Sequence, residues 1–102
     1  MGYLVKSQLM KEKCTEVSSI LKAMAHPQRL MVMCHLNDGE KTVSELLELC
    51  DLSQSQLSQF LQRLQLEGLL QMRKEGQFSY YRIANKDICR LVISLQKIFC
   101  SE

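Results

Sequence analysis

Cysteines are the side chains of this sequence that are best suited to covalent chemistry or metal binding: Cys14, Cys34, Cys50, Cys89 and Cys100. Their number is odd and no two of them form a C-x-x-C pair, which argues against both a secreted disulfide framework and a structural zinc knuckle. In a reducing compartment they would be buried apolar residues or reactive thiols. A cysteine on an apolar helix face is more often a small core residue, so Cys14, Cys50 and Cys89 are expected to pack, whereas Cys100 near the chain end is expected to be exposed.

The sequence around these thiols lacks the groups that enzymes use to activate them. No histidine or carboxylate is placed by a motif beside a cysteine, and no phosphate-binding or metal-binding signature accompanies them. His26, which precedes Pro27, and His35 have no partner spacing and are expected to cap or pack. We therefore expect no catalytic activity, no cofactor and no resident metal.

A second chemically distinctive group is a run of amide and hydroxyl side chains on one predicted helix. Leu57, Leu61 and Leu64 recur at helical spacing and would face the core. The outward face would then carry Gln54, Ser55, Gln56, Ser58, Gln59, Gln62 and Arg63. These side chains can hydrogen-bond to base edges and phosphates in a major groove. An ordinary solvated helix is the alternative, but its face more often carries Lys and Glu.

Two capping motifs define the helix-turn-helix that would present this face. Thr42 with Glu45 and Ser53 with Gln56 each match the S/T-x-x-E/Q pattern, in which a hydroxyl and a later side chain satisfy backbone N–H groups at a helix start. The two starts are eleven residues apart, which leaves room only for a short helix and a turn. We predict a helix-turn-helix over residues 42–67, closed by Gly68 in a left-handed conformation.

A β-hairpin is predicted to follow over residues 69–84. The segment LLQMRKEGQFSYYRI changes from helical to strand periodicity around a turn at Glu75 and Gly76. The basic and amide side chains of this wing, Arg73, Lys74 and Gln77, are candidates for contacts with phosphate or the minor groove.

Three further helices complete the prediction. One runs from about Lys6 to Met24, and a second from Pro27 to about Leu36 is apolar on most sides and should be the buried centre. Asn85 should cap a last helix that starts at Lys86. The last helix carries a continuous apolar stripe of Ile88, Leu91, Val92, Leu95, Ile98 and Phe99. The first helix also has a spare apolar face, so we predict a homodimer whose isologous interface is formed by residues 1–24 and 86–102.

Size and charge agree with a single small DNA-binding domain over residues 1–102. The formal charge is +2 and excludes a polycationic nucleic-acid coat. Residues 38–51 hold five acidic side chains and one lysine, whereas residues 53–84 hold four basic and two acidic ones. The excess of basic side chains therefore lies on the wing and on the second helix of the helix-turn-helix, which we call the reading helix. No apolar stretch is long enough for a membrane span and the first residues lack a signal-peptide core, which predicts a cytoplasmic protein without a membrane partner.

The combined pattern resembles the ArsR/SmtB family of dimeric winged-helix repressors. The resemblance covers about residues 17 to 100 and is carried by LKAMAHPQRLMVMCHL, SELLEL, LSQSQLSQFLQRLQLEGLL and RKEGQFSYYRI. It implies a mainly α fold with a small β-hairpin, in the order helix, helix, helix, helix, strand, strand, helix. It also implies a homodimer that binds a palindromic double-stranded DNA operator and is released by an inducer. In many relatives the position of Phe60 is His and that of Gln65 is Arg, so this chain departs from the family pattern there.

The resemblance suggests several inducers, and the cysteines distinguish between them. The soft-metal site of some members would fall on Thr42 and Ser44, which provide no thiolate pair. A zinc-type site would use Asp87, Cys89 and Cys100, which lack a fourth ligand; a metal-responsive repressor of this kind remains an alternative.

Cys34 and Cys100 instead resemble the cysteine pair of the sulfide-responsive branch, the HlyU and SqrR type. By that resemblance, persulfide or polysulfide would bridge the two thiols and alter or release the DNA-bound dimer. A different alternative is a winged-helix module that binds another protein rather than DNA.

Overall fold

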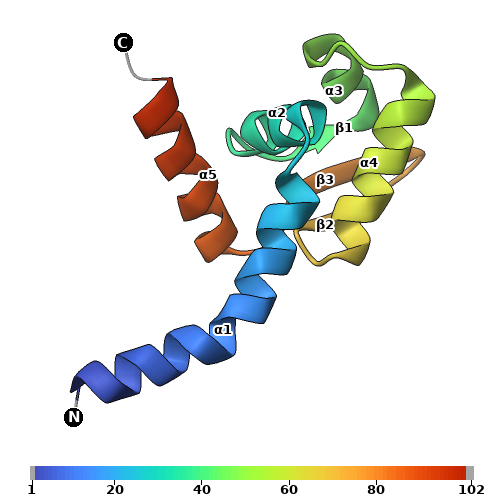
Figure 1. The fold of residues 1–102 in the computed structure, drawn as a ribbon. Helices are drawn as coiled ribbons and strands as arrows, with labels where there is room; N and C mark the ends of the chain where they lie inside the picture. Colours follow the sequence, from blue (N-terminus) through green and yellow to red (C-terminus); the bar gives the residue numbers. More distant parts are fainter. Residues whose placement is uncertain (1, 101–102) are drawn as a thin grey trace.

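The computed structural model describes residues 2–100 of the chain, and within them it shows five helices and one small sheet (Figure 1). In chain order these elements are α1 (Gly2–Met24), α2 (Pro27–Leu36), β1 (Lys41–Thr42), α3 (Val43–Leu49), α4 (Gln54–Leu66), β2 (Leu70–Glu75), β3 (Phe78–Ile83) and α5 (Lys86–Phe99). The predicted mainly α fold with a β-hairpin between the reading helix and the last helix is confirmed.

The helix starts are fixed by the side chains that the sequence motifs identified. The Thr42 hydroxyl accepts from the Glu45 backbone N–H, and the Glu45 carboxylate accepts in return from the Thr42 N–H. Asn85 Oδ1 accepts from the Ile88 N–H at 2.9 Å at the start of α5. His26 is the N-cap of α2, where its Nδ1 accepts from the backbone N–H of Gln28 at 3.1 Å. These caps satisfy N–H groups that have no partner inside the helix.

Glycines with positive φ mark the end of α4 and the turn of the hairpin. Gly68 has φ +83° directly after the α4 C-cap, which confirms the predicted left-handed position. Gly76 has φ +62° in the hairpin turn. Glu75 pairs with Phe78 as the last residue of β2, so the turn consists of Gly76 and Gln77 and lies one residue later than predicted.

The sheet has three strands in the order β1-β3-β2, all antiparallel to their neighbours. Strand β1 was not predicted, because two residues are too few to show the alternation of apolar and polar side chains that identifies a strand. Lys41 lies opposite Tyr81 and Thr42 opposite Tyr80, so β1 joins the start of the helix-turn-helix to the hairpin.

The core lies where α2, α3 and α4 meet the sheet and the start of α5. Leu57, Leu61 and Leu64 of α4 are at most 1% exposed and hold the helix by the face that the periodicity predicted. Helix α2 buries Val32, Met33 and Leu36, as expected for a central helix. Its opposite side is open, since Met31 is 50% exposed, so the prediction that α2 is apolar and buried holds for one face only.

Helices α1 and α5 carry apolar side chains that the single chain does not cover. The first half of α1 extends away from the body of the protein, on the same side as α5 (Figure 1). The exposed apolar side chains on these two helices are Leu9, Met10, Val17, Leu21, Ile93, Ile98 and Phe99. Cys14 is exposed beside them, so the packing predicted for it is not found within the single chain. Between residues 2 and 100, no helix combines the length and apolar character that a bilayer crossing requires.

Candidate nucleic-acid interface and cysteine pair

The outer face of α4 carries every side chain that the sequence assigned to base contacts. All seven side chains are exposed, while the three leucines between them are buried: Gln54, Ser55, Gln56, Ser58, Gln59, Gln62 and Arg63. Because α4 is fixed to the core along one side only, the opposite side is free to enter a groove. The two-sided pattern that the sequence predicted is therefore present.

Gln56 has a second role that limits its use for base contacts. Its Oε1 accepts from the backbone N–H of Ser53 at 3.1 Å and from the Ser53 hydroxyl at 3.2 Å, while the Ser53 hydroxyl accepts from the Gln56 N–H. The carbonyl end of the Gln56 amide thus caps α4, and only its Nε2 remains to donate to a base. Gln59 has no capping role, so both ends of its amide are available for contacts with a base.

A polar hollow connects the exposed face of α4 to the wing. This hollow has a volume of about 220 Å³ and lies between the starts of α3 and α4 and the tip of the hairpin. It is lined by Gln54 and Ser58 of α4, by Gln77 and Phe78 of the hairpin, and by Thr42 of β1, among others. The fold therefore brings three predicted site residues, two from α4 and one from the wing, into one concave surface.

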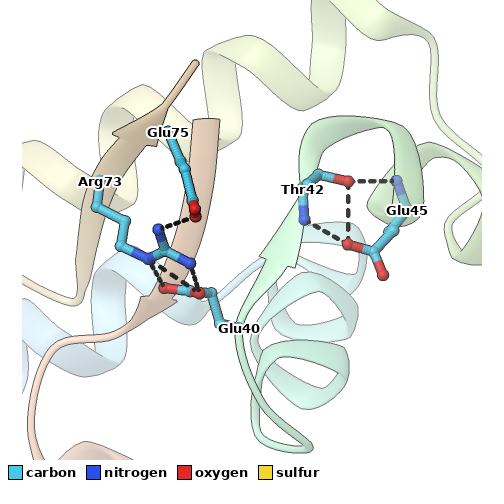
Figure 2. A network of polar contacts seen from close by, with 5 residues as sticks. All are labelled: Glu40, Thr42, Glu45, Arg73 and Glu75. Carbon is cyan, nitrogen blue, oxygen red and sulfur yellow. Dashed lines mark hydrogen bonds and ion pairs between the residues drawn. The ribbon is translucent and has the colours of Figure 1, made fainter. Parts of the chain in front are cut away.

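Arg73 is held by carboxylates of its own chain (Figure 2). Its Nη2 lies 2.7 Å from Glu40 Oε1, its Nε donates to both Glu40 oxygens, and its Nη1 lies 2.7 Å from Glu75 Oε2. The guanidinium also lies 4.3 Å from the centre of the Tyr80 ring, within range of a cation–π contact. Hydrogen bonds from Arg73 hold the pKa of the Glu40 carboxyl below its usual value.

This cluster changes the role expected for Arg73. Its charge is matched by Glu40 and Glu75, and the contact with Glu40 fastens β2 to the segment that leads into the helix-turn-helix. Lys74 and Gln77 are exposed, and within residues 2–100 Lys74 makes no ion pair. Lys74 therefore has no carboxylate partner that phosphate would have to displace, whereas Arg73 would have to exchange Glu40 and Glu75 for phosphate.

Phe60 contacts the start of α2. Its ring centroid lies 5.0 Å from that of His26, and the guanidinium carbon of Arg29 lies 5.6 Å from the same centroid. Arg29 Nε in turn donates to the Ala23 carbonyl at 2.7 Å. This cluster fastens α4 to the α1–α2 junction and was not predicted, although His26 was correctly expected to cap or pack.

Cys34 and Cys100 line a shared hollow between α2 and α5. The hollow has a volume of about 620 Å³, and its walls also include Met31, His35, Asp38, Ile93, Gln96 and Lys97. Cys34 is half-buried on α2, and Cys100 is the exposed C-cap residue of α5. The fold thus brings two thiols that are sixty-six positions apart in the sequence onto one open surface.

The surroundings of Cys34 have opposing effects on its thiol. Burial raises the pKa of Cys34 most strongly, and a hydrogen bond from the Gln96 side chain lowers it. Cys100, when it is a thiolate, and the Asp38 carboxylate raise the pKa of Cys34 further. Cys50, the buried C-cap residue of α3, also has its thiol pKa raised by burial, in agreement with the packing role that was predicted for it.

The alternative zinc-type site does not come together within one chain. Cys89 and Cys100 are eleven residues apart on α5, which places them about 16 Å apart along a helix that rises about 1.5 Å per residue. Among residues 2–100, no three His, Cys, Asp or Glu side chains are grouped as metal ligands would be. A site made from Asp87, Cys89 and Cys100 would therefore have to be shared between two protomers.

Comparison with known proteins agrees with this architecture. The family model described as bacterial regulatory protein, arsR family, matches residues 26–71. The chain is 41% identical to a biofilm growth-associated repressor of Agrobacterium fabrum, over 90% of this chain and 79% of that protein. It is 37% identical to the transcriptional activator HlyU of Vibrio cholerae, over 97% and 92% of the two chains.

Solved structures of relatives superpose closely. Reduced HlyU from Vibrio cholerae matches with a TM-score of 0.85 at 36% identity, covering 92% of this chain and 99% of that one. A homodimeric winged helix-turn-helix domain from Mycobacterium bovis, described as a possible ArsR-family regulator, matches with a TM-score of 0.76 at 31% identity, covering 87% and 82%. The helix-turn-helix, the wing and these relatives together show that the chain belongs to the arsR family of bacterial regulatory proteins, as a DNA-binding transcriptional regulator with a winged helix-turn-helix fold.

Proposed function

We propose that this regulator is a homodimer that binds a palindromic operator while its thiols are reduced, and that it releases the operator when sulfur bridges Cys34 to Cys100. The observation that carries the proposal is the shared hollow between α2 and α5, which both cysteines line. The other cysteines support it by contrast, since Cys50 is buried at the end of α3 and Cys14 and Cys89 do not line this hollow.

Dimer formation is supported by the uncovered apolar surfaces of α1 and α5. Ile98 and Phe99 are 68% and 77% exposed at the end of α5, next to the cysteine hollow. Exposed apolar surface of this kind is a common feature of protein interfaces, and a twofold axis would cover the same residues on both protomers. The related Mycobacterium bovis domain is homodimeric. A twofold dimer would present two α4 helices to successive major grooves, about 34 Å apart.

Each α4 would enter the major groove with its amide and hydroxyl face. The side chains proposed to contact base edges are Gln54, Ser55, Ser58, Gln59 and Gln62, together with the Nε2 of Gln56. Arg63, Lys74 and Gln77 would contact phosphates or the minor groove, joined by Arg73 if phosphate displaces Glu40 and Glu75. The polar hollow between α4 and the hairpin is where the two groups of contacts would meet.

The proposed inducer is an inorganic polysulfide, which supplies both the bridging sulfur and the oxidising equivalents. For trisulfide, the Cys34 thiolate attacks the central sulfur, one S–S bond breaks and hydrosulfide leaves. The Cys100 thiolate then attacks the same sulfur, the second S–S bond breaks and another hydrosulfide leaves. The protein gains a Cys34–S–Cys100 bridge, its two thiols are oxidised, and the two terminal sulfurs of the reagent are reduced to sulfide.

Such a bridge would act on DNA binding through the position of α5 relative to α2. Helix α2 contacts α1, α3, α5 and the hairpin, so a change between α2 and α5 affects both the proposed dimer interface and the helix-turn-helix. Coupling between two such sites is typically about 1 to 3 kcal/mol, which corresponds to a loss of about 5- to 150-fold in operator affinity.

The test pairs intact mass spectrometry with a gel shift on DNA from the regulator's own promoter, before and after treatment with polysulfide, peroxide or zinc. Wild type should gain one sulfur and lose two hydrogens, and should release the DNA. Cys34→Ser and Cys100→Ser should keep binding after treatment, and Cys89→Ser, on the same helix as Cys100, should behave as wild type. Release by zinc with unmodified thiols would refute the proposal and favour the metal-responsive alternative.

A further inference from the structure

The side chain of Gln96 lies between the two helices that carry the cysteine pair. From α5 its Nε2 donates to the Cys34 carbonyl at 3.5 Å, and its Oε1 accepts from Asn37 Nδ2 at 3.4 Å. Cys34 is on α2 and Asn37 is the C-cap of α2, so both contacts cross from α5 to the end of α2. Gln96 is half-buried and lines the same hollow as Cys34 and Cys100.

The contact with the Cys34 carbonyl determines which end of the Gln96 amide faces Cys34. Oxygen and nitrogen of an amide are distinguished by their hydrogen-bond partners, and a backbone carbonyl can only accept. The oxygen of Gln96 therefore faces Asn37, and its NH2 group, which has two N–H donors, faces Cys34. One donor reaches the Cys34 carbonyl, which leaves the second available for the sulfur.

The remaining groups on the hollow make a donor at this position important for Cys34. The thiolate form is disfavoured by partial burial and by the charges of Cys100 and Asp38, and the hydrogen bond from Gln96 opposes these effects. His35 and Lys97 also line the hollow. Gln96 differs from them because it contacts Cys34 itself, through the Cys34 carbonyl, and its hydrogen bond lowers the pKa of the thiol.

We propose that Gln96 is the positioning residue of the cysteine pair, with its amide oriented by Asn37 so that it donates to the Cys34 sulfur and holds it in the hollow. This inference rests on the proposed sulfur chemistry and adds the residue that sets its rate. Gln96 takes no part in bond making or breaking. It also links α5 to α2 through side-chain contacts before any bridge is formed.

The test measures the pH dependence of Cys34 alkylation in the full-length, reduced protein. The thiolate is the nucleophile, so the rate of reaction with iodoacetamide reports how much of it is present. Trypsin cleavage after Lys and Arg places each of the five cysteines in a different peptide, with Cys34 in residues 30–41 and Cys89 in residues 87–90. Mass spectrometry can therefore follow Cys34 with Cys89 as a reference in the same sample.

Two substitutions separate the hydrogen bond from packing. Gln96→Leu removes the donor, while Gln96→Glu keeps the shape but replaces the donor with a negative charge. Both should slow alkylation of Cys34 about tenfold at neutral pH, the equivalent of about 1.4 kcal/mol, and move its pH–rate curve upward by about one pH unit, with the larger shift for Gln96→Glu. Gln65→Leu, the same change on the exposed end of α4, should leave the curve unchanged.

The outcomes distinguish this inference from the proposed function. If the Cys34 curve is the same in wild type, Gln96→Leu and Gln96→Glu, the positioning role is refuted even where polysulfide still bridges the thiols. If the curve shifts as expected but polysulfide neither bridges wild type nor releases DNA, the proposed function fails and the local role of Gln96 stands. Should Gln96→Leu unfold, Asn37→Ala, which frees the Gln96 oxygen, should give a smaller shift in the same direction.

Discussion

Phe99 offers a direct test of the proposed dimer because it is large, apolar and exposed at the end of α5. With 77% of its surface exposed, it presents about 150 Å² of apolar area, taking a phenylalanine side chain as about 200 Å². We predict that Phe99→Ala weakens dimerisation without unfolding the chain, because this side chain lies outside the buried core of the protomer.

The size of the effect follows from the area that the interface would cover. If the substitution removes about 100 Å² of buried apolar area in each protomer, the loss is about 2.5 kcal/mol per copy at 25 cal/mol per Å². Because an isologous interface contains Phe99 of both protomers, the total loss is about 5 kcal/mol. Association recovers only part of the energy expected from buried area, so we expect about 2 to 5 kcal/mol. The dimer dissociation constant should rise by about 30- to 4,000-fold.

Sedimentation equilibrium over a range of concentrations measures this constant, and operator binding by the same samples measures its consequence. Phe78→Ala is the matched control, since Phe78 is also 50% exposed but lies at the wing, away from α1 and α5. It should leave the dimer constant unchanged. A wild-type protein that stays monomeric at all concentrations, or a Phe99→Ala dimer as tight as wild type, would refute the proposed interface.

Four further predictions concern the reading helix, the wing and the core. Gln59→Ala should cost about 1 to 3 kcal/mol of operator affinity, mainly at one base pair. Lys74→Gln should instead weaken binding to all sequences and reduce the slope of log K against log [salt] by about one. Fluorescence anisotropy with mutated operators at several salt concentrations checks both predictions. The Glu40–Arg73 ion pair should persist from neutral into mildly acidic solution and be lost only as the pH falls through the lowered pKa of Glu40, because a depressed carboxyl pKa favours the paired form above it. Arg73 also pairs with Glu75, so an NMR titration of the Arg73 side chain should show this transition in Glu75→Gln and not in the double variant Glu40→Gln, Glu75→Gln. Leu61→Ala should lower the free energy of unfolding by about 2 to 5 kcal/mol in urea denaturation, since this side chain is 1% exposed; a loss well below that range would mean that α4 is not anchored through this leucine.

Some contacts were outside the reach of sequence patterns. Arg73 binds Glu40, which is thirty-three positions away in the sequence. From the sequence alone, Arg73 was predicted to contact phosphate or the minor groove, and its carboxylate partner could not be identified. Gln56 was placed both in a capping box and among the base-reading residues, and the structure shows that its carbonyl oxygen serves the cap. Cys14 was expected to pack and is exposed, because whether a helix face is covered depends on what lies against it.

The sequence by itself determined the parts of this protein that depend on neighbours within a few residues. The caps at Thr42 and Ser53, the buried leucine face of α4 and the hairpin all follow from side chains that meet their partners within one turn or across one tight turn. Tertiary packing decided the rest. Cys34 and Cys100 share a hollow, and Gln96 reaches Cys34, only because α5 lies against α2. Spacing along the chain cannot encode such distant contacts, because they depend on how the helices pack around the core and not on the local repeat of either helix.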